Sequence, residues 1–68
     1  MPRYFFVLQW PSHKHDDNEG TVLPNDKAAR AYGDRVIREL KQAGGYDDPM
    51  LRMIVQKAAR ETLFSIRF

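Results

Sequence analysis

The sequence predicts a small α+β domain in which an antiparallel sheet of three or four strands packs one face against a single helix. Three observations predict this fold: an aromatic, strand-like run opens the chain, one amphipathic stretch follows a polar loop, and the last third ends in alternating apolar residues. With 68 residues, the chain forms one domain at most, spanning 1–68. The expected order of elements is strand, short strand and helix, followed by two further strands if the last third forms a hairpin.

The first strand is predicted over residues 3–10, where aromatic and β-branched residues are enriched. Because side chains alternate along a strand, two faces can be assigned. One face carries Tyr4, Phe6, Leu8 and Trp10, and the other carries Arg3, Phe5, Val7 and Gln9. Pro11 ends the strand because proline lacks a ladder amide. Residues 11–20 are predicted to form a polar loop, and residues 21–23 a short second strand.

The helix is the clearest element in the sequence. Asn25 or Asp26 can cap its first amides, and Gly44-Gly45 supply a left-handed stop. The apolar arc consists of Ala29, Tyr32, Gly33, Val36, Ile37, Leu40 and Ala43. A mid-helix glycine costs about 1 kcal/mol relative to alanine. Gly33 therefore indicates a close approach of the helix to the sheet.

The last third allows two interpretations on propensity alone. Asp48-Pro49 could begin a second helix, since proline suits the first helical position. Alternatively, residues 53–55 and the alternating run 62–68 form two strands of a hairpin that turns around residues 57–60. The residues themselves favour neither interpretation over the other.

One helix covers only one face of a sheet, so the other face is predicted to be an apolar interaction surface. The predicted core consists of Tyr4, Phe6, Leu8, Val36, Leu40, Phe64 and Ile66. Phe5 and Val7 should lie on the open face, together with either Leu51, Met53 and Val55 or Ile54, and with Leu63 as a further candidate. The predicted interface is Phe5, Val7, Met53 and Val55. We expect a twofold homodimer through this face or through an edge strand, because so short a chain has a small core.

The distribution of charge along the chain predicts an alternative function. The net charge is +2, but residues 1–26 carry −2 and residues 27–68 carry +4. The outer helix face contains Lys27, Arg30, Arg38 and Lys41, which could neutralise the phosphates of a nucleic acid. Asp34 interrupts this face and can pair with Arg30 or Arg38 one turn away. An ordinary solvated helix face is the favoured interpretation, and nucleic-acid binding is the alternative function.

The remaining chemistry is sparse. The chain has no cysteine, which excludes disulfides and thiolate metal sites. His13-Lys14-His15-Asp16-Asp17 is the only cluster of metal-ligand types, and a solvated loop is its favoured interpretation because structural zinc sites hold four ligands on folded elements. The acidic pairs 16–17 and 47–48 fall on predicted loops, where they serve turns and solubility. We therefore expect no enzyme activity, no metal and no cofactor, and a cytoplasmic protein without a membrane segment.

Two motifs resemble a family of short, uncharacterised proteobacterial proteins that are common in rhizobia. The chain begins Met1-Pro2-Arg3-Tyr4-Phe5-Phe6, and its loop closes with Glu19-Gly20-Thr21-Val22-Leu23-Pro24-Asn25, similar to an EGTELPD-like motif. An Ala28-Ala29-Arg30-Ala31 helix start and the closing run 62–68 extend the resemblance over nearly the whole chain. The resemblance implies two terminal strands and so favours the hairpin, although the glycine usual in the family's turn is missing here. It implies no activity, because the family is a domain of unknown function.

Overall fold

The computed structural model describes residues 1–46 and 48–68; Asp47, one of the predicted loop acids, lies outside the described residues. The elements are β1 (Arg3–Gln9), β2 (Lys14–His15), β3 (Thr21–Val22), α1 (Asp26–Ala43), β4 (Arg52–Lys57), the 3-10 turn η1 (Ala58–Arg60) and β5 (Glu61–Arg67). The predicted α+β class is therefore confirmed. No helix in the described part of the chain is long and apolar enough to cross a membrane.

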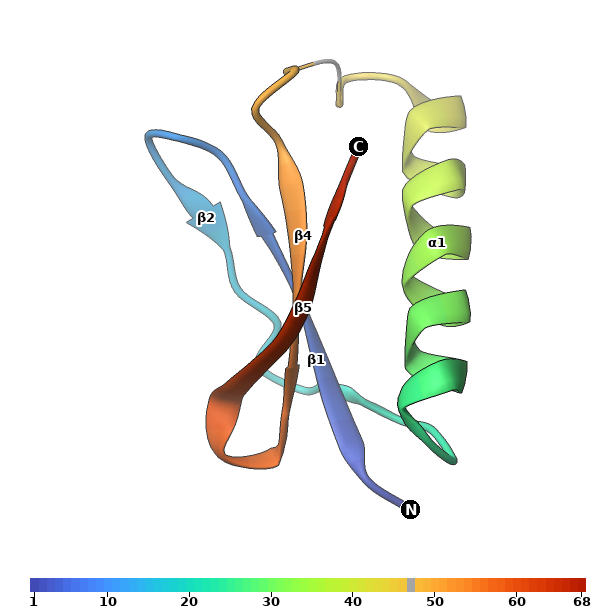
Figure 1. Cartoon of the computed structure of the whole chain (residues 1–68). Coiled ribbons are helices and arrows are strands. Elements are labelled where there is room, and N and C mark those ends of the chain that lie inside the picture. Colours follow the sequence, from blue (N-terminus) through green and yellow to red (C-terminus); the bar gives the residue numbers. More distant parts are fainter. Residues whose placement is uncertain (47) are drawn as a thin grey trace.

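The sheet is antiparallel throughout, with strand order β2-β1-β4-β5, and β3 pairs with the other end of β1. Helix α1 stands alone on one side of it (Figure 1). The predicted short strand after the loop is confirmed as β3, which places Thr21 opposite Tyr4. Strand β2 lies within the segment predicted to be loop, and its two polar, exposed residues carry no strand-like pattern.

Register fixes which side chains meet the helix. Phe6 is opposite Val55, and Leu8 is opposite Met53, so these four share the helix side. The buried core consists of Tyr4, Leu8, Ala29, Ile37, Leu51, Met53, Val55 and Ile66, with Phe6, Val36, Leu40, Phe64 and Trp10 among the half-buried residues packed against it. All seven predicted core residues thus contribute to the core or pack directly against it.

The helix begins and ends where its sequence indicates. The Asn25 side chain accepts a hydrogen bond from the Ala28 amide at 2.8 Å. At the other end, Gly44 has φ +86° and its amide donates to the carbonyls of Leu40 and Lys41. A Cβ on Gly33 would lie only 3.1 Å from Ile66 Cδ1. The predicted close approach of α1 to the sheet at this glycine is therefore confirmed.

A polar contact fixes the start of α1 to the sheet. The Tyr4 hydroxyl donates to Asp26 Oδ1 at 2.6 Å, and Lys57 Nζ lies 3.2 Å from the same oxygen. Burial, aided by Asp26, raises the pKa of Tyr4 to about 12. The hydrogen bond from Tyr4, together with Lys57, holds the pKa of Asp26 below its ordinary value. One carboxylate thus joins β1, α1 and β4.

The last third is a hairpin, as the resemblance implied, and the alternative of a helix beginning at Asp48-Pro49 is wrong. β4 and β5 pair from Arg52 opposite Arg67 to Lys57 opposite Glu61, with a bulge between Val55 and Gln56. In the turn, Ala59 and Arg60 have φ of 74° and 63°, a left-handed conformation that favours glycine. The hairpin forms here without a glycine, because the pairing of two long strands outweighs the local strain.

Candidate interaction surface

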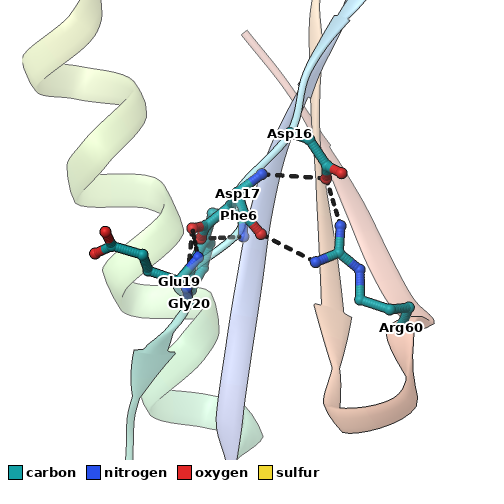
Figure 2. Close-up of polar contacts among 6 residues, drawn as sticks. All are labelled: Phe6, Asp16, Asp17, Glu19, Gly20 and Arg60. Carbon is teal, nitrogen blue, oxygen red and sulfur yellow. Dashed lines mark hydrogen bonds and ion pairs between the residues drawn. The ribbon is translucent and has the colours of Figure 1, made fainter.

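The acidic loop after β2 is held against β1 by one carboxylate. Asp17 Oδ2 accepts the Phe6 amide at 3.1 Å, while Asp17 Oδ1 accepts the amides of Glu19 at 3.3 Å and Gly20 at 2.9 Å. Figure 2 shows the three bonds converging on this side chain. Because β2 pairs with one end of β1 and β3 with the other, Asp17 takes the place of a strand partner between them.

Gly20 completes this loop at a position where only glycine fits. Its φ is +74°, and a Cβ here would meet Tyr4 O at 2.9 Å and Phe5 Cε1 at 3.0 Å. The glycine of the Glu19-Gly20-Thr21 motif therefore lets the loop backbone run directly against β1.

Arg60 covers the aromatic ring that the sequence placed on the open face. Its guanidinium donates to Asp16 Oδ1 and, at 3.0 Å, to the Asp17 carbonyl, as Figure 2 shows. The Arg60 Cζ atom lies 4.5 Å from the centroid of the Phe5 ring, a cation–π contact. Burial acts to raise the pKa of Asp16, but the hydrogen bond and the charge of Arg60 outweigh it and hold that pKa below its ordinary value.

The structure places the four residues of the predicted interface on opposite sides of the sheet. Phe5 and Val7 lie on the open face, but Met53 and Val55 do not: they are 1% and 0% exposed in the core beneath α1. Their alternative, Ile54, is opposite Val7 and shares the open face with it. Val7 itself is only 4% exposed, and Phe5 lies under Arg60. The open face therefore presents little apolar surface.

A groove opens on the helix side instead, where the sequence predicted a closed core. It has a volume of about 260 Å³ and runs between α1 and the acidic loop. Its lining consists of Phe6, Leu8, His15, Asp17, Thr21, Tyr32, Val36, Leu40, Tyr46 and Met53. Five of these side chains are large, apolar or aromatic, and only half-buried: Phe6, Tyr32, Val36, Leu40 and Tyr46. These five side chains give the groove an accessible apolar lining.

One stripe of α1 forms the wall of this groove. Ala28, Tyr32, Val36 and Leu40 recur at every fourth position, and all four are half-buried. The neighbouring stripe of Ala29, Gly33 and Ile37 is buried against the sheet. Tyr32 packs on Phe6 with ring centroids 4.8 Å apart, and a second hollow beside it is lined by Leu23, Ala28, Ala31, Tyr32 and Arg35. The helix thus presents an apolar ridge along its groove side.

The basic helix face predicted for nucleic acid is partly neutralised. Arg30 pairs with Asp34 at 3.6 Å, the pairing that the sequence suggested, and its guanidinium also lies 5.4 Å from the Phe64 ring. Lys27, Arg38 and Lys41 are exposed on the outer side of the helix. The four predicted residues do not converge on a shared recess in the described part of the chain.

The predicted metal-ligand cluster is dispersed by the fold. His13 stacks on Trp10 with centroids 4.4 Å apart, while His15 lines the groove. Asp16 and Asp17 turn to Arg60 and to loop amides, respectively. These side chains belong to separate contacts, and no group of three or more candidate metal ligands forms among the residues described.

A comparison with models of known protein families matches residues 3–68 to a domain of unknown function, DUF6894. The chain belongs to the DUF6894 family. This match confirms the resemblance at the level of a domain of unknown function, and it assigns no activity. No curated protein and no solved structure matches this DUF6894 chain.

The sequence does not predict the groove, although it carries one signal for it. Its pattern places Tyr32, Val36 and Leu40 on a single apolar arc, which is wide for a helix that meets one sheet. A wide arc allows one stripe to be buried while the next stays half-exposed. The contact in which Arg60 covers Phe5 has no such signal in the sequence, because the two residues lie 55 positions apart in the chain.

Proposed function

We propose that this DUF6894 domain is a protein-interaction module that associates with a second copy of itself through the groove side of α1. The observation that carries the proposal is the apolar ridge of Ala28, Tyr32, Val36 and Leu40 beside the groove. Ridges of every-fourth residues pack into each other when two helices cross at about −50°. A twofold axis near Val36 would place Tyr32 of each copy near Leu40 of the other. The proposed role is binding and involves no catalysis.

Size supports this association. A stable interface buries about 800 Å² on each partner, which is roughly a sixth of the 4634 Å² surface of this chain. The groove and the hollow lined by Leu23 and Ala31 together extend along most of α1. Burying them would add the apolar contact that so short a chain lacks within its own core.

The open face supports self-association less well than the groove side. Its cations Arg3, Lys14, Arg52 and Arg67 share the side of the sheet that carries Phe5, and two such faces in contact would bring like charges together. The resemblance to rhizobial-type proteins and the cysteine-free sequence support a bacterial cytoplasm as the setting of this association.

Cysteine cross-linking tests the proposal, because the natural chain contains no thiol. Val36→Cys should form a disulfide-linked dimer under mild oxidation, since the proposed axis brings the two Val36 side chains together. Ile54→Cys is the matched control: it is also half-buried and β-branched, but it lies on the opposite face. Cross-linking of Ile54→Cys with none of Val36→Cys would mean that the open face is the interface.

Light scattering after gel filtration gives the second measurement. We expect a mass about twice the 8.0 kDa of one chain, unchanged at high salt because apolar contacts resist screening. Val36→Glu should reduce it to that of a single chain, whereas Ile54→Glu should not. A wild-type mass of one chain at every concentration would contradict the proposal.

A further inference from the structure

A row of positive side chains crosses the open face at one end of the sheet. Lys14 is opposite Gln9 in the β2–β1 pair, Gln9 is opposite Arg52 in the β1–β4 pair, and Arg52 is opposite Arg67 in the β4–β5 pair. Directly opposed residues of antiparallel strands point to the same face. Gln9 shares the face of Phe5 and Val7, so all four side chains of this row belong to the open face. We call Lys14, Gln9, Arg52 and Arg67 the basic row.

Two arginines of the basic row, Arg52 and Arg67, are directly opposite each other in neighbouring strands. The Phe68 amide donates to the Leu51 carbonyl at 3.4 Å, which makes Phe68 and Leu51 a hydrogen-bonded pair. The adjacent pair of Arg52 and Arg67 is therefore of the other type, in which opposed side chains lie closest. Like charges directly opposite each other destabilise a sheet.

No ion pair among the described residues neutralises this pair of like charges. Arg30, Arg35, Lys57 and Arg60 each form an ion pair with a carboxylate, but none of the four ion pairs in residues 1–46 and 48–68 involves the basic row. A local arrangement that opposes stability and is not compensated within the fold is typical of a binding site.

The dimensions and chemistry of the basic row indicate what it binds. Neighbouring strands are about 4.8 Å apart, so a row across four strands spans about 14 Å. An extended peptide places every second side chain on one side, and positions i, i+2 and i+4 span about 13 Å. Arginine forms paired hydrogen bonds with a carboxylate. We propose that the basic row binds an acidic segment of a partner protein, extended across the strands, with carboxylates at alternate positions.

The same face is less suited to single-stranded nucleic acid. Binding of that kind combines basic side chains with aromatic rings on which bases stack. Phe5 is the aromatic residue that the described strands place on the open face, and the Arg60 guanidinium already lies over its ring at 4.5 Å. The basic row also lies on the opposite side of the sheet from the groove, so an acidic segment and a second copy could bind at the same time.

Fluorescence anisotropy with a labelled (Asp-Ser)5 peptide tests this proposal at low salt. The wild-type domain should bind it and should not bind the matching (Asn-Ser)5 peptide. Arg52→Gln/Arg67→Gln should weaken binding by about tenfold or more, because each charge-assisted contact is worth roughly a factor of ten. The matched control is Arg38→Gln/Lys41→Gln, which removes the same charge from the outer side of α1 and should change affinity by less than about threefold.

Three results would overturn the proposal. The first is no binding of (Asp-Ser)5 by a wild-type domain with a cooperative melting curve. The second is an equal loss in both double variants, which would mean that only net charge matters. The third is tighter binding of a labelled ten-residue oligothymidylate that also depends on Arg52 and Arg67, which would make the row a nucleic-acid surface. The groove-side cross-link of Val36→Cys is independent of all three.

Discussion

The two sides of the sheet cover their apolar residues in different ways. On the open face, Val7 is 4% exposed although no helix lies over it, and the long side chain of Arg60 covers Phe5. On the helix side, Phe6 and Leu8 still line a groove of about 260 Å³ although α1 lies on that side. The helix side is thus open at one edge, although its centre is fully buried.

The widths of one helix and of a four-stranded sheet explain why the helix side stays open at one edge. A helix with its side chains is about 10 Å across, enough for two or three strands spaced about 4.8 Å apart. At Gly33, α1 meets Met53 of β4, Ile66 of β5 and Phe6 of β1. Strand β2 lies beyond this cover, and the gap at that edge becomes the groove. Long arginine side chains, by contrast, can lie along a flat sheet and keep their charge in water.

Gly20→Ala gives the largest expected effect, because Gly20 belongs to the loop that packs on β1 beside the groove. The added Cβ would clash with the Tyr4 carbonyl at 2.9 Å and stand at φ +74°, so we expect a loss of about 2–4 kcal/mol in unfolding free energy. Gly45→Ala is the matched control: its φ is +85° but nothing lies within 4 Å, and it should lose only about 1 kcal/mol. Equal losses in urea denaturation would mean that the loop does not press on β1.

Ala59→Gly, in the turn beside the open face, should instead raise the free energy of unfolding. Ala59 has φ 74° in the turn that carries Arg60 over Phe5. Glycine relieves the strain of the left-handed conformation but also makes the unfolded chain more flexible. Because the relief of strain is the larger of the two free-energy terms, we expect the free energy of unfolding to rise by about 0.5–1 kcal/mol. Ala58→Gly, at the neighbouring position without a positive φ, should instead lower stability. A gain in both variants would contradict the turn geometry.

Acid titration tests one carboxylate on each side of the sheet and has the smallest expected effect. The pKa of Asp16 on the open face and that of Asp26 on the helix side are both lowered in the fold. Each carboxylate therefore stabilises the fold above its unfolded pKa near 3.8, and this stability is lost as pH falls through the lower folded value. Asp16→Asn and Asp26→Asn should each flatten the fall of Tm at acid pH. If Tm falls with pH as steeply in either variant as in the wild type, the carboxylate removed in that variant does not contribute to stability.

The acid series also sharpens the comparison of the two faces. Asp16→Asn weakens the anchor of Arg60 and should increase binding of an apolar dye at Phe5. Asp26→Asn weakens the contact to Tyr4 and Lys57 at the start of α1 and should leave Phe5 covered. Equal dye binding in the two variants would show that Arg60 does not shield the ring.

The sequence by itself determined the first strand, the short strand after the loop and the helix, in that order. Alternation in residues 3–9, the cap at Asn25 and the stop at Gly44 are local signals that act through backbone conformation and neighbouring side chains. The resemblance was needed to favour the hairpin, because Ala59 and Arg60 give no turn signal of their own. Local patterning could also not decide the phase of β4, since residues 52–57 offer apolar side chains on both faces.

Only the tertiary structure decided where the apolar surface remains. The pairing of Leu8 with Met53 set the phase of β4 and moved Met53 and Val55 into the core. The contact of Arg60 with Phe5 and the alignment of Lys14, Arg52 and Arg67 each join residues from separate strands. Such juxtapositions depend on strand register and on the width of one helix over four strands, and neither quantity is encoded in any single segment of the chain.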